Sequence, residues 1–268
     1  MSRRRNLKDK LDSLGEIGDI MRAMKNLAFM ETKKLSGFLS AQQRAVRSIE
    51  RAASDFTHFH GVEAGRKLFE TRLLIGSERG LCGDFNEKLL RASDTNRPVV
   101  AIGRRLESKL ENKLILIEGA NVAEEVESVL MKVVDYLAIM QGNLPENEAL
   151  GITAIYHSDE AGGVRERRLL PLPEQQTAVF FSHEPYLYLD PAEFYEKLSV
   201  HYLYAALHEA LYSSLMVENR YRLDHMENAI RQMDRRIEQF GQRYNMLRQE
   251  EITEEIEVIM LSVEALAN

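Results

Sequence analysis

The sequence predicts a small α/β domain inserted between two long helices that pair as an antiparallel coiled coil. Apolar residues recur with a three-four spacing at both ends of the chain, which is typical of a coiled-coil seam. Between the ends, short apolar runs alternate with helical stretches, which indicates a mostly parallel sheet. We expect residues 1–60 to form the N-terminal coiled-coil helix, 66–190 a Rossmann-like α/β domain, and 191–268 the C-terminal coiled-coil helix.

The C-terminal stretch, from about Pro191 to Asn268, requires a second long helix elsewhere in the chain. After Pro191 it contains no proline and one glycine, Gly241, so one continuous helix is expected. At 1.5 Å per residue this helix would be roughly 100 Å long, too long to bury its seam against a compact domain alone. The seam residues are Leu223, Met226, Ile230, Met233, Ile237, Phe240, Tyr244 and Leu247, and then, one residue out of phase, Ile252, Ile256, Ile259, Val263 and Leu266.

The N-terminal stretch supplies the second long helix. Its seam slips near Met24, and small residues such as Gly18 on it permit close helix approach. Two unrelated amphipathic helices on one core would show similar spacing, so periodicity alone leaves that alternative open. The seam residues are Leu7, Leu11, Leu14, Gly18 and Met21, followed by Ala28, Thr32, Leu35, Leu39, Gln42, Val46, Ile49, Ala53 and Phe56.

The middle of the chain carries the strand signals. Helices are expected at Asp84–Ser93 and after Asn121, which is a candidate helix cap. The stretches Gly61–Gly65 and Pro185–Pro191 mark the domain boundaries. The expected strands are Thr71–Ser77, Arg97–Gly103, Leu114–Ile117 and Ala149–Tyr156, with edge strands at Arg167–Pro171 and Ala178–Phe181.

Composition argues against several classes of protein. The chain has 35 basic and 42 acidic residues, a net charge of −7 that argues against a general nucleic-acid binder. Its one cysteine, Cys82, excludes an internal disulfide. No apolar run reaches the roughly 18 residues of a membrane span, and none follows the arginines of Met1–Arg5 as in a secretory signal. Any membrane association is therefore expected to come through partners.

The turn Gly76–Gly83 occupies the place where a Rossmann domain binds pyrophosphate, because it follows a strand and opens a helix. Its spacing departs from GxGxxG, and it lacks the Lys-Ser/Thr of a Walker loop. The next strand ends in Arg104 and Arg105, and an arginine there could accept a 2′-phosphate. A tight structural turn is the favoured interpretation, with a nucleotide-dependent enzyme as an alternative.

The remaining candidate groups form no catalytic arrangement. Cys82 could be a helix-terminal thiolate, but no histidine lies nearby in sequence to act as its base. His58 and His60 lack the further ligands of a metal site, and the acidic stretch Glu124–Glu127 lacks a partner group. We expect no active site, no cofactor and no metal on this chain.

A set of short stretches, in order along the chain, matches one protein family. They are Ala23-Met24 with Leu27-Ala28, Ser77–Gly83, Glu184-Pro185, Glu218 with Arg222, Leu223 and Met226, and Tyr244-Asn245, Arg248-Gln249 and Ile252–Glu255. Together they resemble the gamma subunit of F-type rotary ATP synthases. The chain departs from that family at Phe29–Glu31, where small residues and a lysine are usual, and at Ile230–Arg236, where a small polar stretch is usual. These departures suggest a divergent branch or paralogue, of the kind that serves an alternative ion-translocating ATPase.

The resemblance implies a central-stalk rotor that couples transmembrane ion flow to ATP synthesis or hydrolysis by turning inside a catalytic head. The implied partners are the alpha and beta subunits of the head, an epsilon-type stalk subunit and a membrane ring of c-type subunits. It also implies a peripheral position on the cytoplasmic face of the inner (cell) membrane, without nucleic acid or direct membrane insertion. A non-motor coiled-coil scaffold is the alternative. The implied partner-contact residues are Met24, Arg79, Gly80, Cys82, Arg222, Arg248, Gln249, Thr253 and Glu255.

Overall fold

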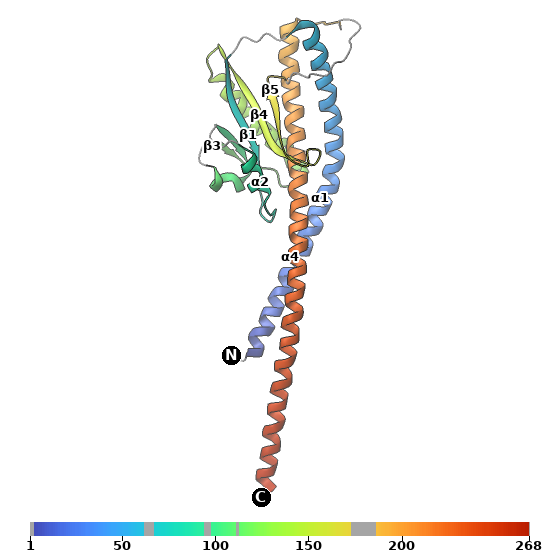
Figure 1. The fold of residues 1–268 in the computed structure, drawn as a ribbon, viewed down its shortest axis with the longest axis vertical. Helices are drawn as coiled ribbons and strands as arrows, with labels where there is room; N and C mark the ends of the chain where they lie inside the picture. Colours follow the sequence, from blue (N-terminus) through green and yellow to red (C-terminus); the bar gives the residue numbers. More distant parts are fainter. Residues whose placement is uncertain (1–2, 62–66, 94–97, 111–112, 173–185, 268) are drawn as a thin grey trace. The chain divides into compact units, whose positions relative to one another are not determined.

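The computed structural model describes residues 3–61, 67–93, 98–110, 113–172 and 186–267. These residues form two compact units. The coil unit consists of Met1–Leu27 and Leu223–Asn268, and the α/β unit of Ala28–Arg222. Two long helices, α1 (Arg3–His60) and α4 (Pro191–Ala267), each contribute to both units (Figure 1). The long terminal helices that the sequence predicts are therefore present.

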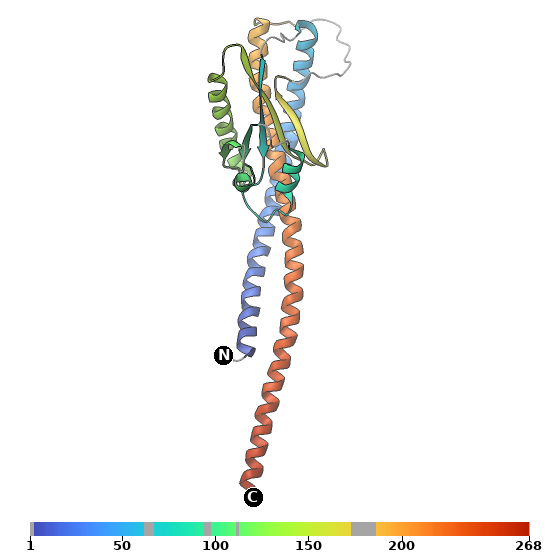
Figure 2. The same ribbon diagram turned by 60° about the vertical axis from the view of Figure 1, so that its left-hand side comes forward.

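In the coil unit, α1 and α4 lie side by side and run antiparallel (Figures 1 and 2). Arg22 Nη2 lies 2.8 Å from Asp234 Oδ1, and Arg4 Nη1 lies 2.8 Å from Glu251 Oε2. These ion pairs are exposed, so each contributes at most about 1 kcal/mol. The predicted seam side chains up to Leu247 are buried or half-buried, and this apolar seam holds the two helices together.

Among the described residues, no helix faces the last part of the predicted seam. Glu251 already pairs with Arg4, close to the start of α1, so α1 does not cover the turns of α4 that follow. Ile252 and Ile256 are 44% and 52% exposed, and Val263 is 60% exposed. The prediction that these residues continue the seam is wrong, because an apolar stripe becomes a seam only where a second helix lies opposite it.

The α/β unit contains a five-stranded mixed sheet with strand order β3-β2-β1-β4-β5. The central strand β1 (Lys67–Ile75) pairs in parallel with both β2 (Val99–Ile102) and β4 (Glu148–Ser158). β2 pairs in parallel with β3 (Lys113–Ile117), and β5 (Gly163–Leu170) is antiparallel to β4. The strands predicted at 71–77, 97–103, 114–117, 149–156 and 167–171 fall on β1 to β5 in order. The predicted edge strand at 178–181 lies outside the described residues.

Helices cover both faces of this sheet (Figures 1 and 2). On one face α3 (Val126–Gly142) packs together with α1 and α4 in the main apolar core. On the other face α2 (Phe85–Ala92) and the short helix η1 (Arg104–Lys109) form a smaller core. Leu73 belongs to the first core and Leu74 to the second, because neighbouring residues of a strand point to opposite faces.

The start of α4 is encoded locally. Ala192 N donates to Asp190 Oδ1 at 2.9 Å, which makes Asp190 the N-cap, and Pro191 takes the first helical position, where no N–H is needed. From Tyr202 to Asn219 most side chains of α4 are buried, as expected of a helix enclosed on several sides.

None of the described helices is long and apolar enough to cross a membrane.

The helix cap expected at Asn121 is wrong. Neither the short helix η2 (Ala123–Glu125) nor α3 has a side-chain cap. Glu125 Oε2 instead accepts hydrogen bonds from Asn121 N at 2.7 Å and from Asn121 Nδ2 at 3.1 Å. The asparagine amide therefore acts as a donor here, a role that the sequence does not distinguish from the acceptor role of a cap.

Replacing Val46 by Asp tests the seam between α1 and α4 in the α/β unit. Val46 is 1% exposed, so the substitution buries an unpaired carboxylate, and we expect the free energy of unfolding to fall by roughly 3–5 kcal/mol. Chemical denaturation followed by circular dichroism measures this change. Ser48→Asp, which adds the same charge at an exposed position two residues away, is the matched control. Equal effects of the two substitutions would contradict burial of the seam.

Candidate functional site

The turn after β1 lies at the carboxyl ends of the parallel strands. Two glycines allow these strand ends to approach closely. A Cβ on Gly76 would lie 2.6 Å from side-chain carbons of Leu106, and a Cβ on Gly103 would lie 2.7 Å from Gly76 O. Gly103 also has a φ of +103°, which other residues rarely adopt. The backbone therefore requires Gly103, and the packing of Leu106 requires Gly76.

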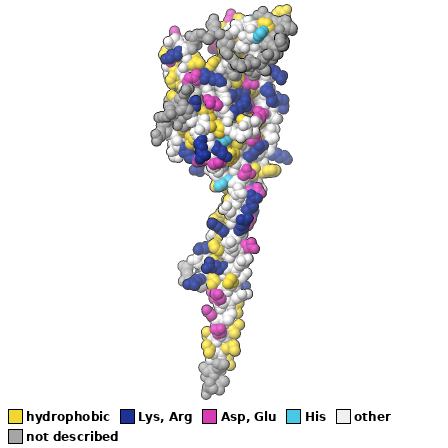
Figure 3. Space-filling view, viewed as in Figure 1, with side chains coloured by type: hydrophobic (Ala, Val, Ile, Leu, Met, Phe, Trp, Pro, Cys, Tyr) yellow, Lys and Arg dark blue, Asp and Glu magenta, His cyan; other side chains and the backbone are white. Residues whose placement is uncertain are grey.

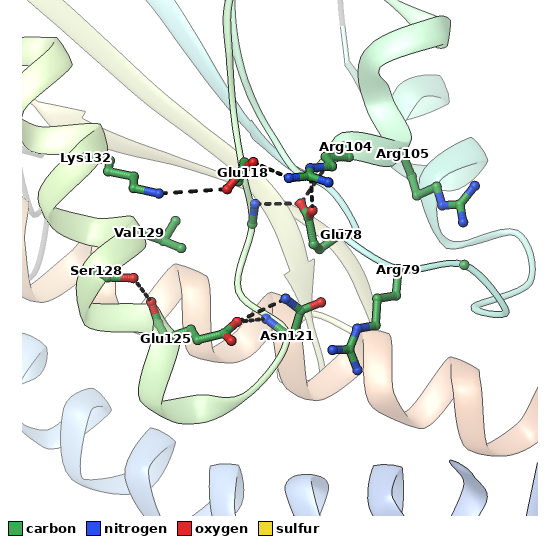
Figure 4. A pocket seen from close by; sticks show the side chains of 12 residues that line it. Glu78, Arg79, Arg104, Arg105, Glu118, Asn121, Glu125, Ser128, Val129 and Lys132 are labelled. Atoms are coloured by element: carbon green, nitrogen blue, oxygen red, sulfur yellow. Dashed lines mark hydrogen bonds and ion pairs between the residues drawn. The ribbon is translucent and has the colours of Figure 1, made fainter.

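Glu78 joins the ends of three strands. Its Oε2 accepts hydrogen bonds from Gly119 N at 2.7 Å and from Arg104 N at 3.0 Å, and Arg104 Nε lies 3.1 Å from its Oε1 (Figure 4). Glu78 follows β1, Arg104 follows β2 and Gly119 follows β3. The Glu78 side chain is only 9% exposed, and its carboxylate holds the ends of β1, β2 and β3 together.

Cys82 is fixed inside the turn. Its Sγ donates to Ser77 Oγ at 3.4 Å, and Asn86 Nδ2 donates to the same oxygen at 2.7 Å. The thiol is buried, and this burial raises the pKa of Cys82 above its ordinary value. A thiol with a raised pKa is a poor nucleophile at neutral pH, which favours a packing role.

Helix α4 brings Arg222 against the same turn. Arg222 Nε donates to Gly80 O at 3.5 Å, Nη1 donates to Asn219 Oδ1 at 2.6 Å, and Nη2 pairs with Glu218. Arg222 is 7% exposed and Glu218 is 3% exposed. Burial raises the pKa of Glu218 to about 7, although Arg222 acts in the opposite direction. Arg222 thus bonds within the chain and holds the turn, which its position in the sequence does not reveal.

Side chains of α4 also close the crevice between β1 and β4. The connections from these strands leave in opposite directions across the sheet, and ligands of open α/β sheets bind at such a switch point. Here Ser214 Oγ donates to Ile75 O at 3.0 Å, and Ser213 Oγ donates to His157 O at 3.1 Å. His157 stacks on Phe85, and burial lowers its pKa. The chain itself therefore fills the place where a nucleotide would bind.

Two hollows flank the turn, with volumes of about 770 and 650 Å³. Figure 4 shows the residues that line the larger one. Arg104 and Arg105 line both hollows. Arg104 pairs with two glutamates, whereas Arg79 and Arg105 make no ion pair with a described residue. The hollows therefore present cationic side chains, but the described lining residues include no nucleophile with a base beside it.

The other candidates from the sequence are packed or paired. The ring of His60 lies 4.9 Å from that of Phe56, and His58 packs edge-on against a neighbouring phenylalanine. Glu124 pairs with Lys34. Within the described parts of the chain, no group of three or more His, Cys, Asp and Glu side chains could hold a metal ion.

The candidate contact residues of the coil unit lie on its surface. Arg248, Gln249, Thr253 and Glu255 are exposed, and Met24 is half-buried. Thr253 Oγ1 donates to Gln249 O of its own helix at 2.9 Å. At 3.6 residues per turn, Arg248, Gln249 and Thr253 lie within about one and a half turns and span roughly 140° of the circumference of α4, a broad exposed face.

Comparisons with known proteins agree along the whole chain. A family model described as ATP synthase matches residues 3–266. The ATP synthase gamma chain of Coxiella burnetii (strain CbuG_Q212) is 24% identical, with 99% of each chain covered. That of Legionella pneumophila (strain Paris) is 22% identical over 99% of this chain and 100% of the relative. Among solved structures, the rotor of the Euglena gracilis mitochondrial ATP synthase matches with a TM-score of 0.63 at 14% identity, covering 93% of this chain and 98% of that one.

Replacing Glu218 by Gln tests the buried carboxyl group. Its pKa rises from 4.5 to about 7 on folding, so its contribution to stability is complete below pH 4.5 and is lost as the pH rises through 7. Between about pH 5 and pH 8, the melting temperature of the wild-type chain should therefore fall relative to that of Glu218→Gln. Glu196→Gln removes an exposed carboxylate of the same helix and should follow the wild type. Parallel curves for wild type and Glu218→Gln would refute the raised pKa.

Proposed function

This chain belongs to the ATP synthase gamma-chain family, and on that premise we propose that it acts as the rotor of a central stalk. Turning inside a catalytic head, the rotor couples transmembrane ion flow to ATP synthesis or hydrolysis. Its changing contacts bias the conformations of successive catalytic subunits by differential binding. An asymmetric pair of helices suits this role, because it presents a different surface to each subunit.

The observation that carries the proposal is the apolar end of α4. Ile252, Val258 and Leu261 are 44%, 66% and 66% exposed, and helical geometry places them on more than one side of α4. Figure 3 shows hydrophobic side chains along this end of the helix. A helix that is apolar on several sides is normally buried, and large exposed apolar patches mark interaction sites. A ring of catalytic subunits around this end would cover it.

For the coil unit, we propose contacts with the alpha and beta subunits of the head through Arg248, Gln249, Thr253 and Glu255. Arginine donors and the glutamine amide suit directional bonds to partner carboxylates. Such charge-assisted bonds contribute roughly 1.5–3 kcal/mol each when desolvated and much less when exposed. Met24, half-buried on α1, would add an adaptable apolar contact.

For the α/β unit, we propose that the turn after β1 contacts the head through Arg79 and Gly80. Arg79 is exposed and makes no ion pair with a described residue, so it is available to a partner carboxylate. Arg222 and Cys82 support this contact from beneath, since Arg222 bonds to Gly80 O and Cys82 fixes the turn. Their contribution to a partner contact is then indirect.

The α/β unit is best regarded as a Rossmann-like insert, because four neighbouring strands of its sheet are parallel. We propose that this unit contacts an epsilon-type stalk subunit and a membrane ring of c-type subunits, on the cytoplasmic face of the inner membrane. The similar structures are the rotor and an F1/c-ring assembly of the Euglena gracilis mitochondrial ATP synthase, which supports contact with a membrane ring.

Two rival functions make different predictions. A coiled-coil scaffold needs only the seam, so it would not purify with catalytic and rotor-ring subunits, whereas a rotor would. A nucleotide-dependent enzyme needs an open switch point, and here Ser213 and Ser214 bond to the ends of the strands that would form it. The second rival is therefore disfavoured by the geometry.

The double substitution Arg248→Ala with Gln249→Ala tests the proposed contact of the coil unit. In the reconstituted complex we expect fewer ions pumped per ATP hydrolysed, because directional contacts with the moving subunits are lost. ATP-driven ion pumping and ATP hydrolysis, measured together, give this ratio. Arg243→Ala removes an exposed arginine of the same helix outside the matching stretches and should leave the ratio unchanged. Unchanged assembly, turnover and coupling in the double variant would show that neither side chain contributes to coupling.

Titration calorimetry with NADP and ATP tests the turn Glu78–Gly83. We expect no saturable binding at micromolar concentration, because side chains of α4 fill the switch point beside this turn. The chain's own thermal transition, unchanged by either nucleotide, is a second measurement. Saturable binding that disappears on Gly80→Val would overturn this expectation.

A further inference from the structure

Arg167 connects the sheet to both long helices within the α/β unit. It lies on β5, and its guanidinium pairs with Glu50 of α1 through Nη2 and with Glu209 of α4 through Nη1. Its Nε also donates to Tyr202 Oη of α4 at 3.3 Å. Tyr202 Oη in turn lies 3.4 Å from the Glu50 carboxylate, so the four side chains form one connected network.

This network is removed from solvent. The Arg167 side chain is 10% exposed, Glu209 is 5% exposed and Glu50 is 17% exposed. Burial by itself lowers the pKa of Arg167, but Tyr202, Glu209 and other neighbours raise it above its usual range. The guanidinium therefore stays charged. Its planar fork can bond two carboxylates and a hydroxyl at once, which the single ammonium of a lysine cannot do in the same geometry.

Other contacts between the sheet and the helices lack this combination. The apolar core is non-directional, so it resists separation of the layers more than sliding between them. Ser213 and Ser214 bond the sheet to α4 alone. Glu31 and Lys34 bond α1 to η2, outside the sheet. Among the contacts between described residues, Arg167 is the side chain of the sheet that hydrogen-bonds to both helices.

A buried ion pair of this kind is weak as a source of stability. Removing two charges from water costs several kcal/mol per ion, and apolar replacements of similar size are often neutral or stabilising. Its best-attested contribution is to fix one geometry among several apolar packings. A network of this kind is suited to fixing the register of the helix pair against the sheet.

We propose that Arg167 is a positioning residue for rotary coupling, which fixes β5 to α1 and α4 so that the sheet and the helix pair turn together without slipping. This inference rests on the proposed rotor function. Force applied to the α/β unit by a rotor ring must pass from the sheet to the helices. Directional bonds to both helices carry that force where the apolar core would yield.

The test compares Arg167→Met with Arg168→Met in the reconstituted complex. Arg168 is the next residue of β5 and faces the opposite side of the sheet, where it bonds Glu70 of β1 at 2.6 and 2.8 Å. The substitution Arg168→Met therefore removes an ion pair of the same strand and leaves the side-chain bonds to α1 and α4 in place. We expect Arg167→Met to lower the number of ions pumped per ATP hydrolysed by about threefold or more, with hydrolysis retained. Arg168→Met should match the wild type.

Arg167→Met leaves Glu209 buried without its partner, and this variant can fail to assemble for that reason alone. The uncharged triple variant Glu50→Gln, Arg167→Met, Glu209→Gln removes the whole charge network. It should assemble and still lose coupling. Normal coupling in either variant, or an equal loss in Arg168→Met, would overturn the proposal.

Hydrogen exchange on the isolated full-length chain separates this inference from the rotor function. We expect the amides of β5 to exchange faster in the uncharged triple variant than in Arg168→Met, whether or not the chain assembles into a motor. If the wild-type chain fails to assemble with catalytic subunits but the β5 amides still exchange faster in the triple variant, the rotor function is refuted. The connection of β5 to α1 and α4 through Arg167 then stands. Equal exchange in the two variants would refute the link itself.

Discussion

The structure depends on one constraint: α4 is too long to bury its apolar side chains within a single compact domain. A second long helix must face it, and α1 supplies this surface from the opposite end of the chain. The sheet is then an insertion between the two arms, and its larger core is shared with both of them. Beyond the start of α1 at Arg3, the apolar side chains of α4 become exposed, which is typical of an interaction surface.

The same helix closes the crevice between β1 and β4 in the described part of the sheet, beside a glycine-rich turn. Ser213, Ser214 and Arg222 bond to the strand ends and to the turn, in positions that a nucleotide would otherwise take. The turn packs against α4 through Gly80, and its one arginine, Arg79, is exposed. The mixed sheet thus supports a long helix at its strand ends.

The sequence predicts the elements well because they depend on local pattern. Seam positions such as Val46 and Leu35 follow from the three-four spacing, and both are buried. The sequence does not predict the polar network, because Arg222 and Gly80 are 142 residues apart and Arg167 and Glu50 are 117 apart. A periodic pattern also cannot show where its partner stops, which is why Ile252 and Ile256 are exposed. The matching stretches near Arg248 indicate partner contacts only through a family resemblance.

Pairing between the two ends of the chain has a consequence for synthesis on the ribosome. Gln42 Nε2 donates to Ala205 O across a separation of 163 residues, so α1 leaves the ribosome long before its partner exists. Until then its apolar stripe is open to other chains, and contacts of such long range form slowly. The described strands of the sheet end at Leu170, so the sheet can fold first and shield part of α1.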